Sequence, residues 1–292
     1  MTTPNTPVVN KGLLYVNGLG MAPGALNADN LTTATVLISS GQCRDSTDIN
    51  DIVLPATVAA GAANPNNVPV DANAPFYTLN SAQTGAGGLD VGTIAIDLLY
   101  AVYVIASSNS NVQPSTLLSL SFTQPLLPFG YDMYRRVGAV LTSHAAARFK
   151  WFDQRGRDMW YATNVIALAA GAATTLTSFN LSAAGAGTAN QVPVTASKAY
   201  VLAALTADAG ATRTAIFSAQ NTITIANGGA IGANPGTGEV IMSSPASTVT
   251  SASLMIPVST TAGGVLPATS FYAVSNAAAA LAVSVQGYVD VL

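Results

Sequence analysis

Charged residues are scarce in this sequence of 292 residues. Lysine and arginine number 10 and aspartate and glutamate 13, together 8% of the chain, whereas charged residues make up about 25% of an average soluble domain. Half of the residues are apolar, so serine, threonine, asparagine and glutamine must supply the polar surface, and these suit strands and turns. Weak charge repulsion also lets copies associate closely. We therefore expect an assembly protein; the alternative is a neutral monomeric sandwich.

Two partner classes are excluded by what the chain lacks. The net charge of −3 gives no basic face for phosphate backbones, so we expect no nucleic-acid partner. The longest apolar runs, 93–106 and 272–285, are interrupted by Asp97 and by Ser275 and Asn276, and a spanning helix needs roughly 18 consecutive apolar residues. We therefore expect no membrane span, and the first residues lack the basic stretch of a secretory signal.

Cysteine and histidine each occur once. Cys43 alone cannot form an internal disulfide framework, which favours folding in a reducing compartment. His144 follows Ser143, but adjacent residues of a strand point to opposite faces, so the two do not make a nucleophile and base. With Glu239 as the only glutamate, no pair of carboxylates is indicated for glycosidase chemistry. We expect no enzyme, no cofactor and no catalytic residue.

Three aspartates, Asp45, Asp48 and Asp51, form the only carboxylate group with a regular spacing. Their segment lacks the glycine and the terminal glutamate of a calcium loop. The pattern is more typical of carboxylates that cap turns and pair with Arg44. No metal site is assigned, and a bound cation at residues 45–51 stays an open alternative.

Short apolar runs separated by turn residues indicate an all-β fold. Strands are expected at residues 34–39, 51–58, 76–79, 93–107, 117–123, 136–142, 147–152, 158–161, 174–181, 198–205, 214–218, 222–225, 239–242, 253–258, 270–274 and 281–288. We expect one or two β-sandwich or jelly-roll-like domains. Residues 1–31 would form an extended docking arm, 32–163 a β-sandwich domain, and 164–292 a second β domain or the second half of the sandwich.

Basic and aromatic residues gather between residues 131 and 161. Arginine and tryptophan are enriched at interface hot spots, so we interpret this cluster as an interface. The alternative is that the aromatic residues are core and the basic ones their solvated flanks, paired with nearby aspartates. The predicted interface residues are Arg135, Arg136, Arg148, Lys150, Trp151, Arg155, Arg157 and Trp160. Deleting the side chains of Arg136 and Trp151 would then weaken assembly before folding.

Three segments carry a family resemblance. They are GQCRDST at 41–47 followed by DIVL at 51–54, GLDVG at 88–92 leading into LYAVYVIA at 99–106, and PLLPFGYDMYRRVG at 125–138. These segments resemble recurring parts of tailed-bacteriophage virion proteins, often described as tail-fibre or tail-appendage proteins. Residues 271–275 and 285–288 are similar to the way such chains end.

The resemblance implies a structural protein of the virion, assembled in the host cytoplasm, without catalysis. We expect self-association, with a trimer favoured and a dimer as the alternative, and an arm that binds other virion proteins. A head decoration or head-fibre protein is the closest alternative. A receptor- or glycan-binding module that contacts a host surface is the third, and would need Trp151 or Trp160 exposed for stacking on sugars.

Overall fold

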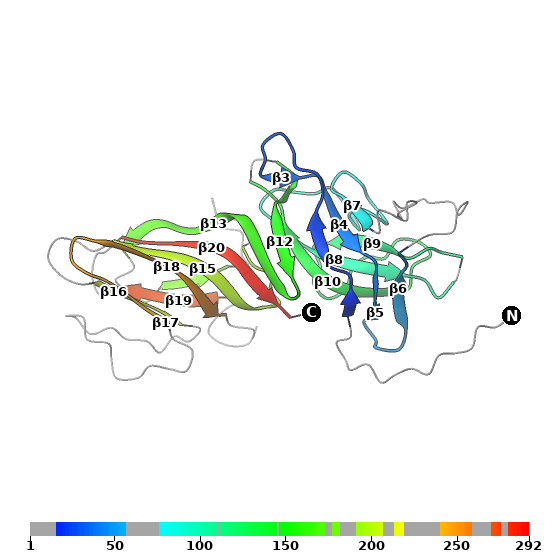
Figure 1. Cartoon of the computed structure of the whole chain (residues 1–292). Coiled ribbons are helices and arrows are strands. Elements are labelled where there is room, and N and C mark those ends of the chain that lie inside the picture. Colours follow the sequence, from blue (N-terminus) through cyan, green and yellow to red (C-terminus); the bar gives the residue numbers. More distant parts are fainter. Residues whose placement is uncertain are drawn as a thin grey trace.

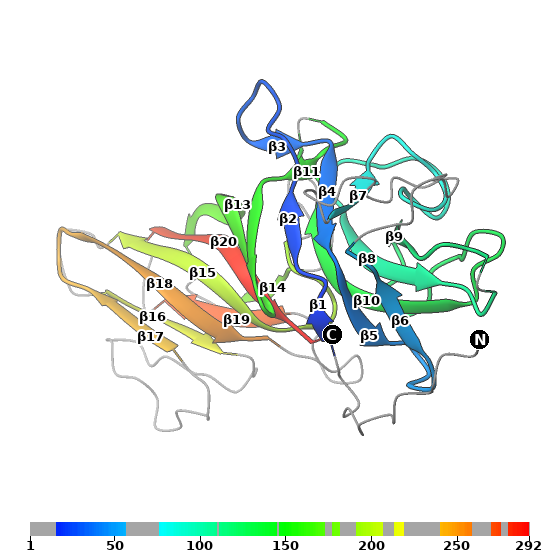
Figure 2. The same cartoon turned by 45° about the vertical axis from the view of Figure 1, so that its right-hand side comes forward.

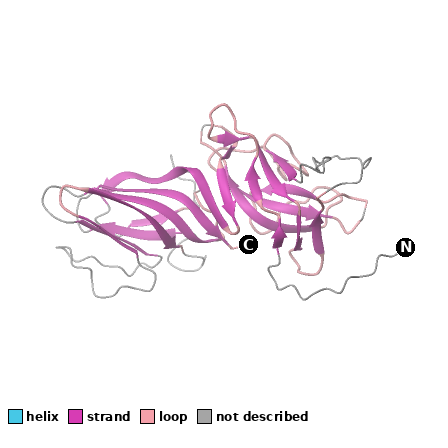
Figure 3. Cartoon of the chain, in the orientation of Figure 1, coloured by secondary structure: helices cyan, strands magenta, loops and turns pink. Residues whose placement is uncertain are grey.

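The computed structural model describes residues 16–56, 76–109, 111–144, 146–172, 177–181, 191–206, 213–218, 240–258, 270–275 and 280–291. Within these residues the chain consists of strands and loops and contains no helix (Figure 3). The predicted all-β fold class is confirmed. The strands gather into two lobes that lie side by side (Figures 1 and 2).

The N-terminal lobe holds short strands in three three-stranded antiparallel sheets and one strand pair. The sheet orders are β1-β5-β6, β2-β4-β7 and β10-β8-β9, and β3 pairs with β11. The strands are β1 (Val16–Gly18), β2 (Met21–Pro23), β3 (Thr32–Thr33), β4 (Thr35–Ser39), β5 (Gly41–Arg44), β6 (Asp51–Leu54), β7 (Phe76–Asn80), β8 (Leu99–Ala106), β9 (Ser115–Ser119), β10 (Met133–Leu141) and β11 (Phe149–Lys150).

The C-terminal lobe is a sandwich of two antiparallel sheets. A five-stranded sheet has the order β12-β13-β20-β15-β18, and a four-stranded sheet has the order β14-β19-β16-β17. The strands are β12 (Phe152–Arg155), β13 (Asp158–Ala172), β14 (Thr177–Asn180), β15 (Ala196–Thr206), β16 (Arg213–Ser218), β17 (Val240–Ser244), β18 (Val249–Pro257), β19 (Ser270–Ser275) and β20 (Ala280–Asp290).

Alternating burial along β15 explains how the sandwich forms. Val201, Ala203 and Leu205 are fully buried, whereas the residues between them are only partly buried. Because successive side chains of a strand point to opposite faces, the buried set faces the four-stranded sheet, where Phe217 of β16 is also fully buried. The other face of the five-stranded sheet is the outer face of the lobe.

In the N-terminal lobe, β8 is the central strand of its sheet and is buried on both faces. Tyr100 and Tyr103 lie on opposite faces, as their spacing predicts, and both are fully buried. Tyr100 belongs to the main core, whereas Tyr103 packs in a second cluster with Leu117 and against Tyr134. Neither side chain is left to form an interface.

The two domain boundaries expected from the sequence can be placed on the elements of the fold. Residues 16–31 of the predicted arm carry β1 and β2, which pair with β5 and β4, and Leu19 and Met21 are core residues; residues 1–15 lie outside the described residues. Asn164, where the composition changes, lies within β13. The predicted strand 222–225 also lies outside the described residues.

Candidate interaction site

The junction of the two lobes is held by an ion pair between predicted interface residue Arg136 and Asp290. Arg136 Nη1 lies 2.5 Å from Asp290 Oδ2, and the two side chains are 9% and 5% exposed. The second terminal nitrogen of Arg136 donates to the carbonyl oxygen of Val291. Thr195 Oγ1 donates to the remaining oxygen, Oδ1, of Asp290 at 2.6 Å. Arg136 therefore acts within one chain rather than on its surface.

Further hydrogen bonds tie the end of β20 to both lobes. Tyr288 donates its hydroxyl proton to the carbonyl oxygen of Ala139 at 2.9 Å, and burial raises the pKa of this phenol. Arg157 donates from Nε to the carbonyl oxygen of Asp290 at 2.9 Å. β20 thus connects the two lobes, and its side chains contact β10 of the N-terminal lobe.

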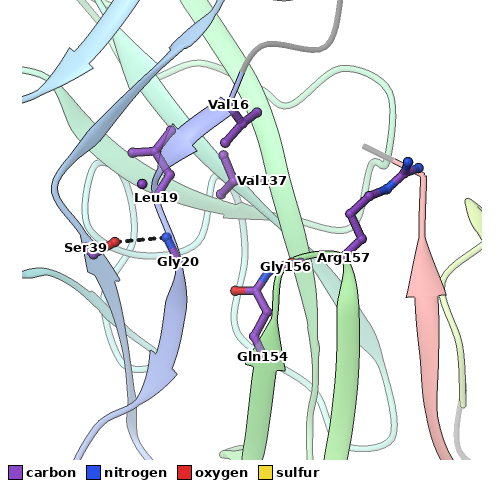
Figure 4. Close-up of a pocket in the computed structure, with 9 residues that line it drawn as sticks. Val16, Leu19, Gly20, Ser39, Val137, Gln154, Gly156 and Arg157 are labelled. Carbon is purple, nitrogen blue, oxygen red and sulfur yellow. Dashed lines mark hydrogen bonds between the residues drawn. The ribbon is translucent and has the colours of Figure 1, made fainter.

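A pocket of about 490 Å³ opens at the same junction (Figure 4). Its lining comes from the N-terminal lobe, including β10, and from the β12–β13 hairpin. The lining residues are Val16, Gly18, Leu19, Gly20, Ser39, Val137, Gln154, Gly156 and Arg157.

The polar groups of this pocket are already engaged in structural hydrogen bonds. Ser39 accepts from the amide of Gly20 at 2.9 Å, drawn as a dashed line in Figure 4. Gln154 accepts from the amide of Met21 at 2.6 Å and donates to the carbonyl oxygen of Gly156 at 3.1 Å. The lining includes no histidine, cysteine or carboxylate. The pocket therefore presents an apolar wall and one guanidinium, but no nucleophile paired with a base.

Arg135, the neighbour of Arg136, points to a different part of the molecule. Its Nη1 lies 3.4 Å from the carbonyl oxygen of Asp45 and 3.7 Å from Asp48 Oδ1. The amide of Ser46 also donates to the carbonyl oxygen of Tyr134 at 2.8 Å. Arg135 therefore anchors the loop that follows β5 onto β10.

That loop is closed by the carboxylate of Asp45. Asp45 accepts hydrogen bonds from the backbone amides of residues 47, 49 and 50 at 3.0–3.3 Å and from the side chains of Thr47 and Asn50. Arg44 pairs with Asp51 at 3.2 Å. The predicted turn-capping role and the pairing with Arg44 are confirmed. Among the described residues no group of three or more histidine, cysteine or acidic side chains could hold a metal ion.

These contacts lower the pKa of Asp45. Burial acts to raise the pKa of this carboxyl, but hydrogen bonds donated by Asn50, Ile49 and Thr47 outweigh burial, so the pKa lies below its ordinary value. The carboxylate is thus held in its charged form as part of the loop structure.

Three predicted interface residues lie near the turn between β10 and β12. The side chain of Arg148 is exposed, whereas Lys150 and Trp151 are partly buried. Burial lowers the pKa of Lys150, opposed by the charge of Asp97. The amide of Trp151 donates to the carbonyl oxygen of Leu31 at 3.0 Å. Arg148 is the only one of these three residues that is exposed.

The remaining two predicted residues lie on the β12–β13 hairpin. Arg155 is exposed and pairs with Asp153 at 2.8 Å. The Trp160 ring stacks on Tyr200 of β15, with centroids 4.1 Å apart and planes 18° apart. Both rings stand over Gly287 of the intervening strand β20. The eight predicted residues are therefore spread over the junction, the Asp45 loop, the 143–151 turn and the hairpin instead of forming one patch.

The isolated histidine has a simple structural environment. His144 Nδ1 contacts Asp97 Oδ2, and the histidine side chain is 77% exposed. No serine or cysteine hydroxyl or thiol is hydrogen-bonded to it among the described residues. His144 is thus an exposed loop residue whose ring contacts a carboxylate.

Apolar side chains that project into solvent were not singled out from the sequence. Phe129 is fully exposed, and Val91, Leu120 and Leu126 are each more than half exposed. Asp90 links the segments that carry the last three, since its amide donates to the carbonyl oxygen of Leu118 and its carboxylate accepts from the amide of Leu126. We name Val91, Leu120, Leu126 and Phe129 the apolar loop residues. The only sequence signal was the apolar PLLPF segment within 125–138.

Comparison with known proteins finds no family model, no curated protein and no solved structure that matches this chain. Within the described residues there is also no helix long and apolar enough to cross a membrane.

Proposed function

We propose that this chain is a structural component of a tailed-bacteriophage particle, a tail-fibre or tail-appendage protein that assembles as a homo-oligomer. The observation that carries the proposal is the geometry of segment 125–138, the longest of the three segments that resemble phage virion proteins. Its second half enters β10, where Arg136 fastens the lobes together. Its first half projects Leu126 and Phe129 into solvent. One segment thus supports the fold and offers an apolar contact to a neighbour.

The surface chemistry supports a role in packing. A fully exposed phenylalanine is unfavourable in water and gains free energy when a partner covers it. The chain also carries few charges that would resist close contact with other subunits. In a large symmetric particle, contacts between subunits cover such surfaces.

A structural role without catalysis agrees with the polar groups of the described residues. The carboxylates of Asp45, Asp132 and Asp290 accept hydrogen bonds from loops or pair with arginine. The buried tyrosines Tyr161 and Tyr288 donate their hydroxyl protons to backbone carbonyl oxygens. These groups maintain a rigid fold instead of facing a substrate site.

The glycan-binding alternative is less well supported by the aromatic side chains. Trp151 and Trp160 are both partly buried. One face of the Trp160 ring is covered by Tyr200, so it does not offer an open platform on which a sugar ring could stack.

The proposal is tested by the copy number of the chain in purified particles, measured by quantitative mass spectrometry against the major capsid protein. A few to a few tens of copies are expected for a tail component. A copy number close to that of the capsid protein would instead identify a head decoration protein and overturn the tail assignment. Absence from the particle would overturn the virion role.

A further inference from the structure

We propose that β18 pairs antiparallel with β18 of a second copy, around a two-fold axis at Ser253. The inference rests on the self-association that we propose above and assigns it to one edge of the C-terminal sandwich. β18 lies next to β15 at the edge of the five-stranded sheet (Figures 1 and 2).

Apart from Pro257 at its last position, the strand lacks the features that usually protect a sheet edge. β18 is the last strand in the order β12-β13-β20-β15-β18 and is nine residues long. It pairs with β15 over nine consecutive residues without a bulge. Its sequence, VTSASLMIP, contains no charge. Natural sheets usually block such an edge with charges, bulges or very short strands because an open edge pairs readily with another strand.

The backbone hydrogen bonds define which groups point away from the sheet. The amide of Val258 donates to the carbonyl oxygen of Ser197 on β15 at 3.1 Å. Because these groups alternate along an antiparallel strand, the even-numbered residues of β18 bond to β15. The odd-numbered residues 249, 251, 253, 255 and 257 direct their amides and carbonyls outward. In the described part of the chain, none of these outward groups has a backbone partner.

The position of Pro257 agrees with this assignment. Proline has no amide proton, and edge strands tolerate it where the missing donor would face outward. Val249, Ser251, Ser253 and Met255 also have exposed side chains. The residues whose backbone groups point away from the sheet are therefore also the residues whose side chains are exposed on its outer face.

A second copy fits this edge by its own sequence. With the axis at Ser253, Ser251 of one copy faces Met255 of the other. The outward-pointing backbone groups of one copy then meet those of the second copy. On the inner face, Ala252 would face Leu254 of the second copy. In these two pairs a large side chain is opposed by a small one, and no charges meet anywhere along the strand.

The pairing would also continue the outer face across both copies. Trp160, Gly287, Tyr200 and Met255 form one row across the sheet. Ser251 of the second copy would extend this row beyond Met255. A two-fold contact of this kind closes at two copies, so the predicted trimer would require a different surface.

The first test is a cysteine placed on the axis. Ser253→Cys puts two thiols on residues that face each other at a Cα separation of about 5.5 Å, which suits a disulfide. The native Cys43 is fully buried and does not compete. Mild oxidation of the purified chain is expected to give a covalent dimer. Ser284→Cys is the matched control, since Ser284 lies in the row of Ser253 on the inner strand β20, and should stay uncrosslinked.

The second test is charge repulsion measured by sedimentation equilibrium. The wild-type chain and Ser284→Lys are expected to have twice the monomer mass of 29.4 kDa. Ser253→Lys should be monomeric, because two ammonium groups would meet at the axis, and mixing it with Ser253→Glu should restore the dimer. Thermal melting checks that each variant is folded.

Two results would overturn the pairing: a monomeric wild-type chain, or a dimer that Ser253→Lys leaves intact and Ser253→Cys does not crosslink. The virion copy number is independent of both. A chain that dimerises through Ser253 but is absent from particles refutes only the virion role, and a monomeric chain found in particles refutes only the pairing.

Discussion

Arg136 in β10 and Asp290 in β20 form a buried ion pair between residues 154 positions apart, with 2.5 Å between the charged atoms. Burying two charges costs free energy that their attraction repays only when the remaining polar atoms are also bonded. Here Val291 and Thr195 supply those bonds. The pair therefore specifies how β10 and β20 meet, and its two members depend on each other.

Removing one member should be far more costly than removing a surface pair. Arg136→Ala leaves Asp290 buried without its counter-charge, so we expect the free energy of unfolding to fall by about 3–5 kcal/mol. Urea denaturation followed by circular dichroism measures the change. Arg155→Ala is the control, because Arg155 and Asp153 are both exposed, and should cost less than about 1 kcal/mol.

This expectation reverses the order anticipated from the sequence for Arg136, where assembly would fail before folding. If Arg136→Ala unfolds at the wild-type urea concentration but no longer assembles, the residue acts at an interface and the structural role is refuted.

The Asp45 loop should make the chain sensitive to acid. The pKa of Asp45 is lowered in the folded chain, so the unfolded chain binds the proton more readily. Its stabilising contribution is complete above the ordinary carboxyl pKa of about 3.9 and is lost as the pH falls through the folded value. Asp45→Asn should therefore lower the melting temperature at pH 7. The difference in melting temperature between pH 7 and pH 3 should be smaller for this variant than for the wild-type chain. Melting curves at both pH values measure this; an undiminished difference would contradict it.

Glycine at position 287 should be required by the close approach of β13 and β20. A Cβ atom there would lie 2.0 Å from the carbonyl oxygen of Met159, and this backbone atom cannot rotate away. We expect Gly287→Ala to destabilise the chain by about 1–3 kcal/mol and to disturb the Trp160–Tyr200 stack, which tryptophan fluorescence reports. Gln286→Ala, on the adjacent partly buried residue, should have little effect. Equal effects of the two substitutions would contradict the role of the close approach.

Most strands could be predicted from apolar runs and alternation, and the differences have physical causes. The structure extends the predicted strand 158–161 to residue 172. The added residues, 162–172, are rich in alanine. They become a strand through pairing with β20, an example of tertiary context overriding weak local preference. Residues 41–44 were not among the expected strands, but they form β5. Gly41 serves a close approach, since a Cβ would lie 2.3 Å from the carbonyl oxygen of Asn17.

The site was only partly predictable. The residue types of the basic cluster were visible in the sequence, but their partners were not, because ion pairing between residues so far apart leaves no local pattern. Asp290 had one signal: a carboxylate at the end of an apolar strand needs a partner. The strand expected from the sequence begins at Ser253 and so misses the first half of β18, residues 249–252. The outward side chains of that half are valine and serine.

Cys43 should be chemically silent in the folded chain. It is fully buried, and burial raises the pKa of its thiol to about 12, so almost none of it is the reactive thiolate at neutral pH. We expect no reaction with a disulfide reagent in native buffer and one thiol per chain in urea. Rapid labelling of the native chain would contradict the buried position. Ala147→Cys, at an exposed position away from β18, is the positive control for reagent access.

Phe129 should contribute to contacts with neighbouring subunits and not to folding. Its side chain is fully exposed, so Phe129→Ser removes no core contact, and the free energy of unfolding should stay within about 0.5 kcal/mol of wild type. Loss of a large apolar contact should weaken incorporation into particles, measured as the ratio of variant to wild-type chain in virions from cells that express both. Phe149→Ser is the contrasting variant, because Phe149 is fully buried and its loss should unfold the chain. Equal incorporation of Phe129→Ser and wild type would show that Phe129 makes no contact in the particle.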